Sequence, residues 1–408
     1  MNQATGIAAP PAAEDKAAFD PSLRPGEQWP LYADDEIEAA AAVLRSGRVN
    51  QWTGPEVFAF QDACTEKFEG GHGIALANGS LALELALKAF GIGPGDEVVV
   101  TPRSFAASAF CVMLQGATPV FADVDADSGN ITAATIEPVL TERTRAIIPV
   151  HLAGWPADMP AIMALADRHG LVVIEDCAQA HGASVDGRSV GSFGHSAAWS
   201  FCQDKIITTG GEGGFTSFQD EALWRWAWSF KDHGKNMEKV FAPQKEPGFR
   251  WLQDSVGTNW RLTGPQAAIG LRQLEKLDEW TALRRRNAAI WARALGQVNG
   301  LRVPQPEARL GHAYYKFYAY LDAPEEEAAP ARDEILRRAG EAGLRVFSGS
   351  CSEIYLERAF DGMARPDLPV TRALGKQSLM VEVHPTLRPE LLEIRAHSLA
   401  RLIGEVLG

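Results

Sequence analysis

A lysine and a carboxylate in the middle of this chain have the setting that cofactor chemistry requires. Lys205 stands between an apolar run at 197–201 and a glycine-rich turn at 210–214. Upstream, another apolar run ends at Asp176, and Gln179 follows three positions later. A lysine can form a Schiff base with pyridoxal 5'-phosphate (PLP), and a carboxylate can keep the pyridine nitrogen of that cofactor protonated. The pattern therefore predicts a PLP site with Lys205 and Asp176 as catalytic residues and Gln179 near the ring hydroxyl.

Each of these residues also has a purely structural interpretation. Most lysines are solvated surface charges, and Asp176 alone could be a loop or capping residue. The apolar run before Lys205 and the glycines after it indicate a constrained and partly buried turn instead. In a parallel α/β sheet, the carboxyl ends of the strands line the binding crevice, which favours a site at Asp176.

The segment Asn78-Gly79-Ser80 precedes a predicted helix. Asn and Ser are common helix caps, so the segment could be structural only. It could equally bind a phosphate, because free backbone N–H groups and the helix dipole favour an anion. Ser200 could donate to that phosphate or bond to its own backbone. Phe105, just after a predicted strand, is either a core aromatic or a platform for a flat cofactor ring.

Composition and charge exclude several classes of protein. The chain has 408 residues, a net charge of −13, 46% hydrophobic residues and 22% charged residues. The acidic balance argues against binding to nucleic acid, which needs clustered Lys and Arg. No apolar run approaches the roughly 20 residues of a membrane-spanning helix, and the N-terminus lacks the pattern of a signal peptide. The five scattered cysteines favour free thiols in a reducing compartment, which predicts a cytoplasmic protein.

Strands and helices alternate over the first half of the sequence, which predicts an α/β fold with a mostly parallel sheet covered on both faces. The alternation ends near residue 218, a long helix with a kink or break follows at 267–295, and a smaller α+β region follows that. The predicted helices are 34–46, 80–90, 106–114, 136–140, 159–169 and 332–342, and the predicted strands are 97–101, 119–121, 146–149, 171–174, 314–321 and 378–383. We expect a flexible extension at 1–24, a large cofactor-binding domain at 25–270, and a linking helix with a smaller domain at 271–408.

Several spaced motifs, in this order, make the chain resemble the DegT/DnrJ/EryC1/StrS sugar aminotransferases. Two of them are Glu175-Asp-Cys-Ala-Gln-Ala-His-Gly-Ala183 and Thr209-Gly-Gly-Glu-Gly-Gly214, and the others lie at 91–98, 116–124, 148–154, 190–194, 232–234, 259–262 and 266–268. The resemblance implies the fold-type I architecture of aspartate aminotransferase, with a seven-stranded sheet between helices in the large domain. It also implies PLP as cofactor and a homodimer with shared active sites.

The resemblance assigns site residues by position. Lys205 would be the Schiff-base lysine, and Asp176 would pair with the pyridine nitrogen. The other implied cofactor contacts are Gln179 at the ring hydroxyl, Gly79, Ser80 and Ser200 at the phosphate, Phe105 stacked on the ring, and Asn259 reaching the phosphate from the neighbouring subunit. No metal is implied.

The implied reaction is transfer of an amino group from L-glutamate or glutamine to a keto group of a nucleotide-linked deoxysugar, as in polysaccharide biosynthesis. Two alternatives remain open: amination of a cyclitol or other cyclic ketone in antibiotic biosynthesis, and a non-catalytic PLP-binding regulator. The chain departs from the common family pattern at Cys202, at Gln203 and in its paired Gly210 and Gly211. Lys205 argues against the dehydratase branch, whose members carry histidine there.

Overall fold

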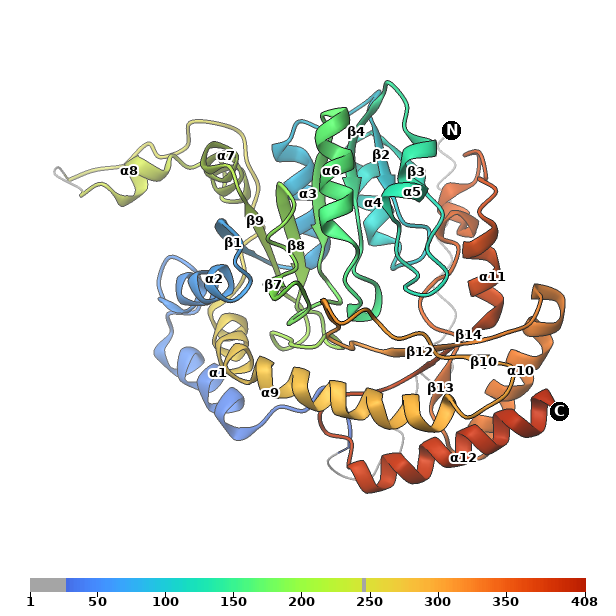
Figure 1. Ribbon diagram of the computed structural model, residues 1–408. Helices are drawn as coiled ribbons and strands as arrows, with labels where there is room; N and C mark the ends of the chain where they lie inside the picture. The colour runs from blue at the N-terminus through green and yellow to red at the C-terminus, as the bar shows by residue number, and fades with distance from the viewer. Residues whose placement is uncertain (1–26, 244–246) are drawn as a thin grey trace, which may run out of the picture.

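The computed structural model describes residues 27–243 and 247–408, and Figure 1 shows the central sheet between helices. The extension predicted at 1–24 lies outside the described residues. Seven strands build the central sheet: β1 (His72–Leu76), β2 (Glu97–Val100), β3 (Thr118–Phe121), β4 (Thr144–Ile148), β5 (Val172–Asp176), β8 (Ser196–Ser200) and β9 (Gly214–Phe218). Their order is β1-β9-β8-β5-β4-β2-β3.

The sheet is mostly parallel, as predicted. Strands β3, β2, β4, β5 and β8 run parallel to one another, whereas β9 pairs antiparallel with both β8 and β1. The carboxyl ends of the parallel strands therefore meet at one edge of the sheet, where a ligand crevice is expected.

Both faces of the sheet are buried, which explains why its strands are apolar without alternation. Val98 and Val100 of β2 pack into one apolar cluster, and Val99 between them packs into another on the opposite face. Three helices supply much of this cover: α3 (Gly79–Ala89) and α4 (Ala107–Leu114) on one face, and α6 (Met159–His169) on the other. The α/β class predicted from the sequence is confirmed.

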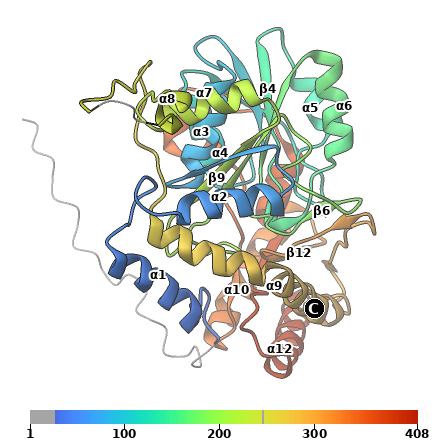
Figure 2. The same ribbon diagram turned by 90° about the vertical axis from the view of Figure 1, so that its left-hand side faces the viewer.

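The long helix α9 (Gly264–Leu295) is continuous, so the predicted kink or break is wrong. Gly270, which favours a break, serves close packing instead: an added Cβ would lie 2.4 Å from the ring of Phe60. The helix starts with a capping box between Thr263 and Gln266. The proposed domain division at residue 270 falls inside α9, which runs from the central sheet to the C-terminal part in Figures 1 and 2.

The C-terminal part contains a second sheet with strand order β10-β12-β14-β13. Its strands are β10 (Leu301–Arg302), β12 (Phe317–Leu321), β13 (Val346–Phe347) and β14 (Ser378–Val381), and its helices are α10 (Glu325–Glu341), α11 (Pro369–Gln377) and α12 (Pro389–Leu407). A separate apolar cluster joins this sheet to α10, α12 and the end of α9.

The remaining α-helices and strands lie around these two sheets. They are α1 (Asp34–Ser46), α2 (Glu56–Lys67), α5 (Ala133–Ile136), α7 (Glu221–Lys231), α8 (Met237–Phe241), β6 (Ser184–Val185), β7 (Arg188–Ser189) and β11 (Leu310–Gly311). The predicted helix at 136–140 thus begins earlier, as α5, and continues as a 3-10 turn, Glu137–Val139. Within the residues described, no helix is long and apolar enough to cross a membrane.

Candidate active site

The predicted site residues gather at the carboxyl edge of the central sheet. Asp176 ends β5 and Ser200 ends β8, and these two strands are neighbours. Gly79 begins α3, and a Cβ added to it would lie 2.5 Å from Cβ of Ser200. Lys205 follows β8 by five residues. Strand order thus brings together residues that are far apart in the sequence.

The carboxylate of Asp176 is buried and oriented by two donors. Its side chain is 4% exposed. One oxygen accepts a hydrogen bond from Ser108 Oγ at 2.8 Å, and the other accepts one from the N–H of Ala178 at 3.1 Å. Burial raises the pKa of Asp176 above its ordinary value, and the hydrogen bond from Ser108 offsets part of this rise. The structure therefore fixes this carboxylate in one orientation away from solvent.

Ser108 is a site residue that the sequence prediction missed. Its hydroxyl also lies 3.3 Å from Ser104 Oγ. Both serines follow β2 and stand four positions apart: Ser104 lies in the loop before α4, and Ser108 lies in the first turn of α4. Two serines so spaced just beyond a strand were the available signal.

Glu175, beside Asp176, has a structural role. Its carboxylate accepts hydrogen bonds from the N–H groups of Gly191, Phe193 and Gly194, and Nε2 of His151 lies 3.1 Å away. Potential metal-ligating atoms of His151, Glu175 and Cys177 lie within 4.8 Å of one another. Because four donors already saturate the Glu175 oxygens, this cluster does not support a metal site.

Gln179 presents its amide at the same edge. The side chain is buried, and Oε1 accepts a hydrogen bond from the N–H of Ala153 at 2.7 Å. This bond fixes the orientation of the amide, so that the NH2 group is left as the donor. That group makes no hydrogen bond to any described residue. A donor in this position fits an acceptor such as a ring hydroxylate.

Lys205 is largely covered, with 15% of its side chain exposed. Nζ lies 3.9 Å from Oδ1 of Asp204 and 5.1 Å from the ring centroid of Tyr315. The backbone carbonyl of Lys205 accepts a hydrogen bond from the indole of Trp29 at 2.8 Å. The lysine is thus held in a constrained turn, as the glycine-rich sequence indicates.

The start of α3 has the features of a phosphate cradle. Asn78 caps the helix by accepting from the N–H of Leu81 at 3.0 Å. The N–H groups of Gly79 and Ser80 precede this bond, and the first N–H groups of a helix have no intrahelical partner. The Cβ that Gly79 lacks would collide with Ser200, so only glycine allows this approach. Together with a buried carboxylate and a covered lysine, this cradle fits PLP.

Phe105 is not a core residue, because 71% of its surface is exposed. The structural alternative considered for it is therefore wrong, and its ring is accessible at the sheet edge for stacking. Asn259 is also exposed, on the segment that follows α8. Among the described residues, no hydrogen bond joins its side chain to the other candidates.

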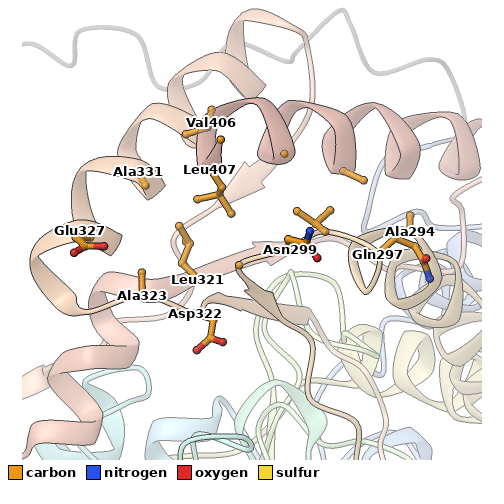
Figure 3. A pocket seen from close by; sticks show the side chains of 15 residues that line it. Ala294, Gln297, Asn299, Leu321, Asp322, Ala323, Glu327, Ala331, Val406 and Leu407 are labelled. Carbon is orange, nitrogen blue, oxygen red and sulfur yellow. The ribbon is translucent and has the colours of Figure 1, made fainter.

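A hollow of about 720 Å³ lies elsewhere, in the C-terminal part. Figure 3 shows it between the end of α9, β12, α10 and the end of α12, with Asn299, Asp322 and Leu407 among its lining residues. None of the predicted site residues lines it. The residues placed for chemistry thus lie at the edge of the central sheet and not in this hollow.

Known proteins resemble this chain over most of its length. The sequence profile described as the DegT/DnrJ/EryC1/StrS aminotransferase family matches residues 30–397. GDP-perosamine synthase of Caulobacter vibrioides is 38% identical over 329 residues, which cover 80% of this chain and 83% of that protein. A Geobacillus stearothermophilus protein named pleiotropic regulatory protein is 35% identical over 372 residues, which cover 91% of this chain and 95% of that one. The X-ray structure of an aminotransferase from Psychrobacter cryohalolentis is 50% identical, with a TM-score of 0.87, and the match covers 93% of this chain and 98% of that chain.

Proposed function

Because this chain belongs to the DegT/DnrJ/EryC1/StrS aminotransferase family, we propose that it moves an amino group from L-glutamate or glutamine to a keto group of a nucleotide-linked deoxysugar. It is a PLP-dependent aminotransferase. The observation that carries the proposal is that Asp176, at the end of β5, and Lys205, in the turn after the neighbouring strand β8, lie close enough for the lysine charge to act on the carboxylate.

The residues at this edge would have separate roles in cofactor binding and amino-group transfer. When bound, PLP supplies an aldehyde that takes up amines and a ring that accepts electron density from the reacting carbon. Gly79, Ser80 and Ser200 would hold its phosphate, and Phe105 would cover one face of its ring. Gln179 would donate to the ring oxygen.

Lys205 and Asp176 handle the protons. The Lys205 amine takes the proton from Cα of the amino donor as a general base. It would pass this proton to the cofactor, and in the second half-reaction it would move a proton from the cofactor to the acceptor carbon that carried the keto group. Asp176, oriented by the hydrogen bond from Ser108, would keep a proton on the ring nitrogen by its negative charge. The covered position of Lys205 limits the access of water to these transfers.

The acceptor class is supported by the relative named GDP-perosamine synthase. We expect a nucleotide-linked keto sugar to react with at least about tenfold higher kcat/KM than a free cyclic ketone such as an inosose. The nucleotide would add binding energy away from the reacting carbon, and about 1.4 kcal/mol suffices for that factor. Transfer of ¹⁵N from labelled glutamate or glutamine, followed by mass spectrometry, measures both acceptors and both donors. Equal or better use of the cyclic ketone would contradict the sugar assignment.

A regulatory role without catalysis is raised by the relative named pleiotropic regulatory protein. The two roles differ in the half-reaction with the amino donor alone. We expect glutamate or glutamine to bleach the visible absorbance of the PLP-loaded protein. A colour that no amino donor changes would favour the regulator.

A second copy of the chain would complete the site. Helix α8 projects from the rest of the molecule in Figures 1 and 2, and the described residues from 247 onward follow it. These following residues carry exposed apolar side chains, of which Trp251 is 82% and Val256 is 90% exposed. The exposed ring of Phe249 lies against that of Trp251, with centroids 4.7 Å apart, and a contiguous exposed apolar patch marks an interaction surface. We propose that a partner subunit covers them and that Asn259, on the same segment, reaches the partner's cofactor phosphate.

Replacement Asn259→Ala is expected to weaken PLP retention about 10- to 100-fold, because a hydrogen bond to a charged group contributes roughly 1.5–3 kcal/mol. Equilibrium dialysis of PLP measures the change, and light scattering measures the oligomeric state. The matched control is Asn299→Ala, an exposed asparagine at the distant hollow, which should leave retention unchanged. A wild-type monomer that retains PLP fully would refute the shared site.

A further inference from the structure

The backbone of Tyr315 is hydrogen-bonded at the edge of the central sheet, although Tyr315 lies in the segment that leads into β12. Its N–H donates to the carbonyl of Ala153 at 2.8 Å, and the N–H of Ala153 donates to Gln179. Gly154 permits this approach, because an added Cβ would lie 3.0 Å from the nitrogen of Tyr315. The C-terminal part thus delivers one tyrosine to the candidate active site by backbone contacts.

The side chain of Tyr315 meets Asp204 and Lys205. Its hydroxyl donates a hydrogen bond to Oδ2 of Asp204. The other carboxylate oxygen lies 3.9 Å from Nζ of Lys205, and Nζ lies 5.1 Å from the ring centroid of Tyr315. Neither Asp204 nor Tyr315 is among the cofactor contacts assigned above. Both nevertheless adjoin the amine that must hold the cofactor and move the proton.

The pKa values of Tyr315 and Asp204 shift in opposite directions. Burial and the charge of Asp204 raise the pKa of Tyr315 well above its ordinary value, so the phenol stays a donor near neutral pH. Although burial acts to raise it, the positive charge of Lys205 and the hydrogen bond from Tyr315 keep the pKa of Asp204 below its ordinary value. The cluster therefore presents a carboxylate toward Lys205, with the phenol hydrogen-bonded to its other oxygen.

We propose that Asp204 and Tyr315 are positioning residues that act on the nitrogen of the linkage between Lys205 and PLP, through the Asp204 carboxylate beside Nζ and the Tyr315 hydroxyl bonded to that carboxylate. The negative charge of Asp204 favours the protonated nitrogen, and the hydrogen bond from Tyr315 withdraws charge from Asp204 and limits that effect. This inference rests on the proposed role of Lys205 in the proposed function. It goes beyond that function because it assigns the tuning of Lys205 to two residues that lie 111 positions apart.

Other charged and titratable groups face Asp204, Lys205 and Tyr315, and all of them are unchanged in the variants described below. They are Asp176 on β5, His181 and Cys202 near Lys205, Lys316 and Tyr318 beside Tyr315, Arg284 on α9, and Glu382 beside Lys316.

The test is a pH titration of the visible absorbance of the PLP-loaded protein without any substrate. Asp204→Asn should lower the proton affinity of the linkage to Lys205 by about two- to fivefold, since the Asp204 side chain is 56% exposed and solvent screens its charge. Asparagine keeps the shape of the side chain and still accepts from Tyr315. Tyr315→Phe should change the proton affinity in the opposite direction, because the full charge of Asp204 then acts on Lys205.

If the two variants shift the proton affinity in opposite directions, the residues act on the linkage electrostatically. General damage to the site would shift the proton affinity in the same direction in both variants. Tyr314→Phe is the matched control and should leave the titration unchanged, because that ring stacks on His312 with centroids 3.7 Å apart. The proposal is overturned if Asp204→Asn changes the proton affinity less than about twofold, if both variants shift it in the same direction, or if the control shifts it equally. Because no substrate is added, these outcomes do not depend on which acceptor the enzyme uses.

Discussion

Replacement Lys205→Ala is expected to abolish transamination and to remove the visible absorbance of the lysine-bound cofactor. Two functions are lost together, since the same amine holds PLP and moves the proton. The loss of proton transfer alone should slow the half-reaction with the amino donor by about 10²- to 10⁴-fold. Stopped-flow absorbance with glutamate or glutamine measures the rate of the half-reaction. The visible absorption spectrum shows whether the lysine-bound cofactor has formed.

A surface lysine serves as the matched control for this change. Lys67 forms an ion pair with Asp278 away from the sheet edge, and Lys67→Ala removes the same charge and the same side-chain atoms. We expect this control to keep both rate and spectrum. Undiminished turnover in Lys205→Ala would show that another amine does the chemistry and would overturn the assignment.

The second large effect is expected from Asp176→Asn. Asparagine has similar volume but no charge, so it cannot keep a proton on the ring nitrogen, and the ring then accepts electrons poorly. Removal of one preorganised electrostatic group of this kind costs about 10²- to 10³-fold in rate. Rapid-quench measurement of the donor half-reaction, in parallel with PLP affinity, separates the chemical step from cofactor loss.

Ser108→Ala provides a graded comparison for Asp176. It leaves the charge in place but removes one of the two hydrogen bonds that orient the carboxylate, so we expect a smaller loss of roughly tenfold. The exposed Asp186, in the turn between β6 and β7, is the charge control, and Asp186→Asn should not change the rate. A Ser108→Ala loss as large as that of Asp176→Asn would mean that orientation, and not charge, is the main contribution.

The sequence alone determined the α/β class and much of the cofactor side of the site. Non-alternating apolar runs at 97–101 and 171–174 predicted strands buried on both faces, and the structure has them as β2 and β5. Asp176 was predicted at a strand end, where the carboxyl ends of parallel strands meet. The glycines after Lys205 similarly indicated a constrained turn. These inferences succeed because periodicity and backbone freedom are local properties.

Only the tertiary structure decided which distant side chains touch. Ser108 reaches Asp176 across 68 positions, and Tyr315 reaches Asp204 across 111 positions. It also decided that Phe105 is exposed and that α9 runs unbroken through Gly270, because that glycine packs on an aromatic ring. No local pattern encodes such contacts, since they depend on strand order and on the close approach of backbones at Gly79 and Gly154. The sequence thus specified which groups could do chemistry, whereas packing across the sheet edge determined which groups orient them.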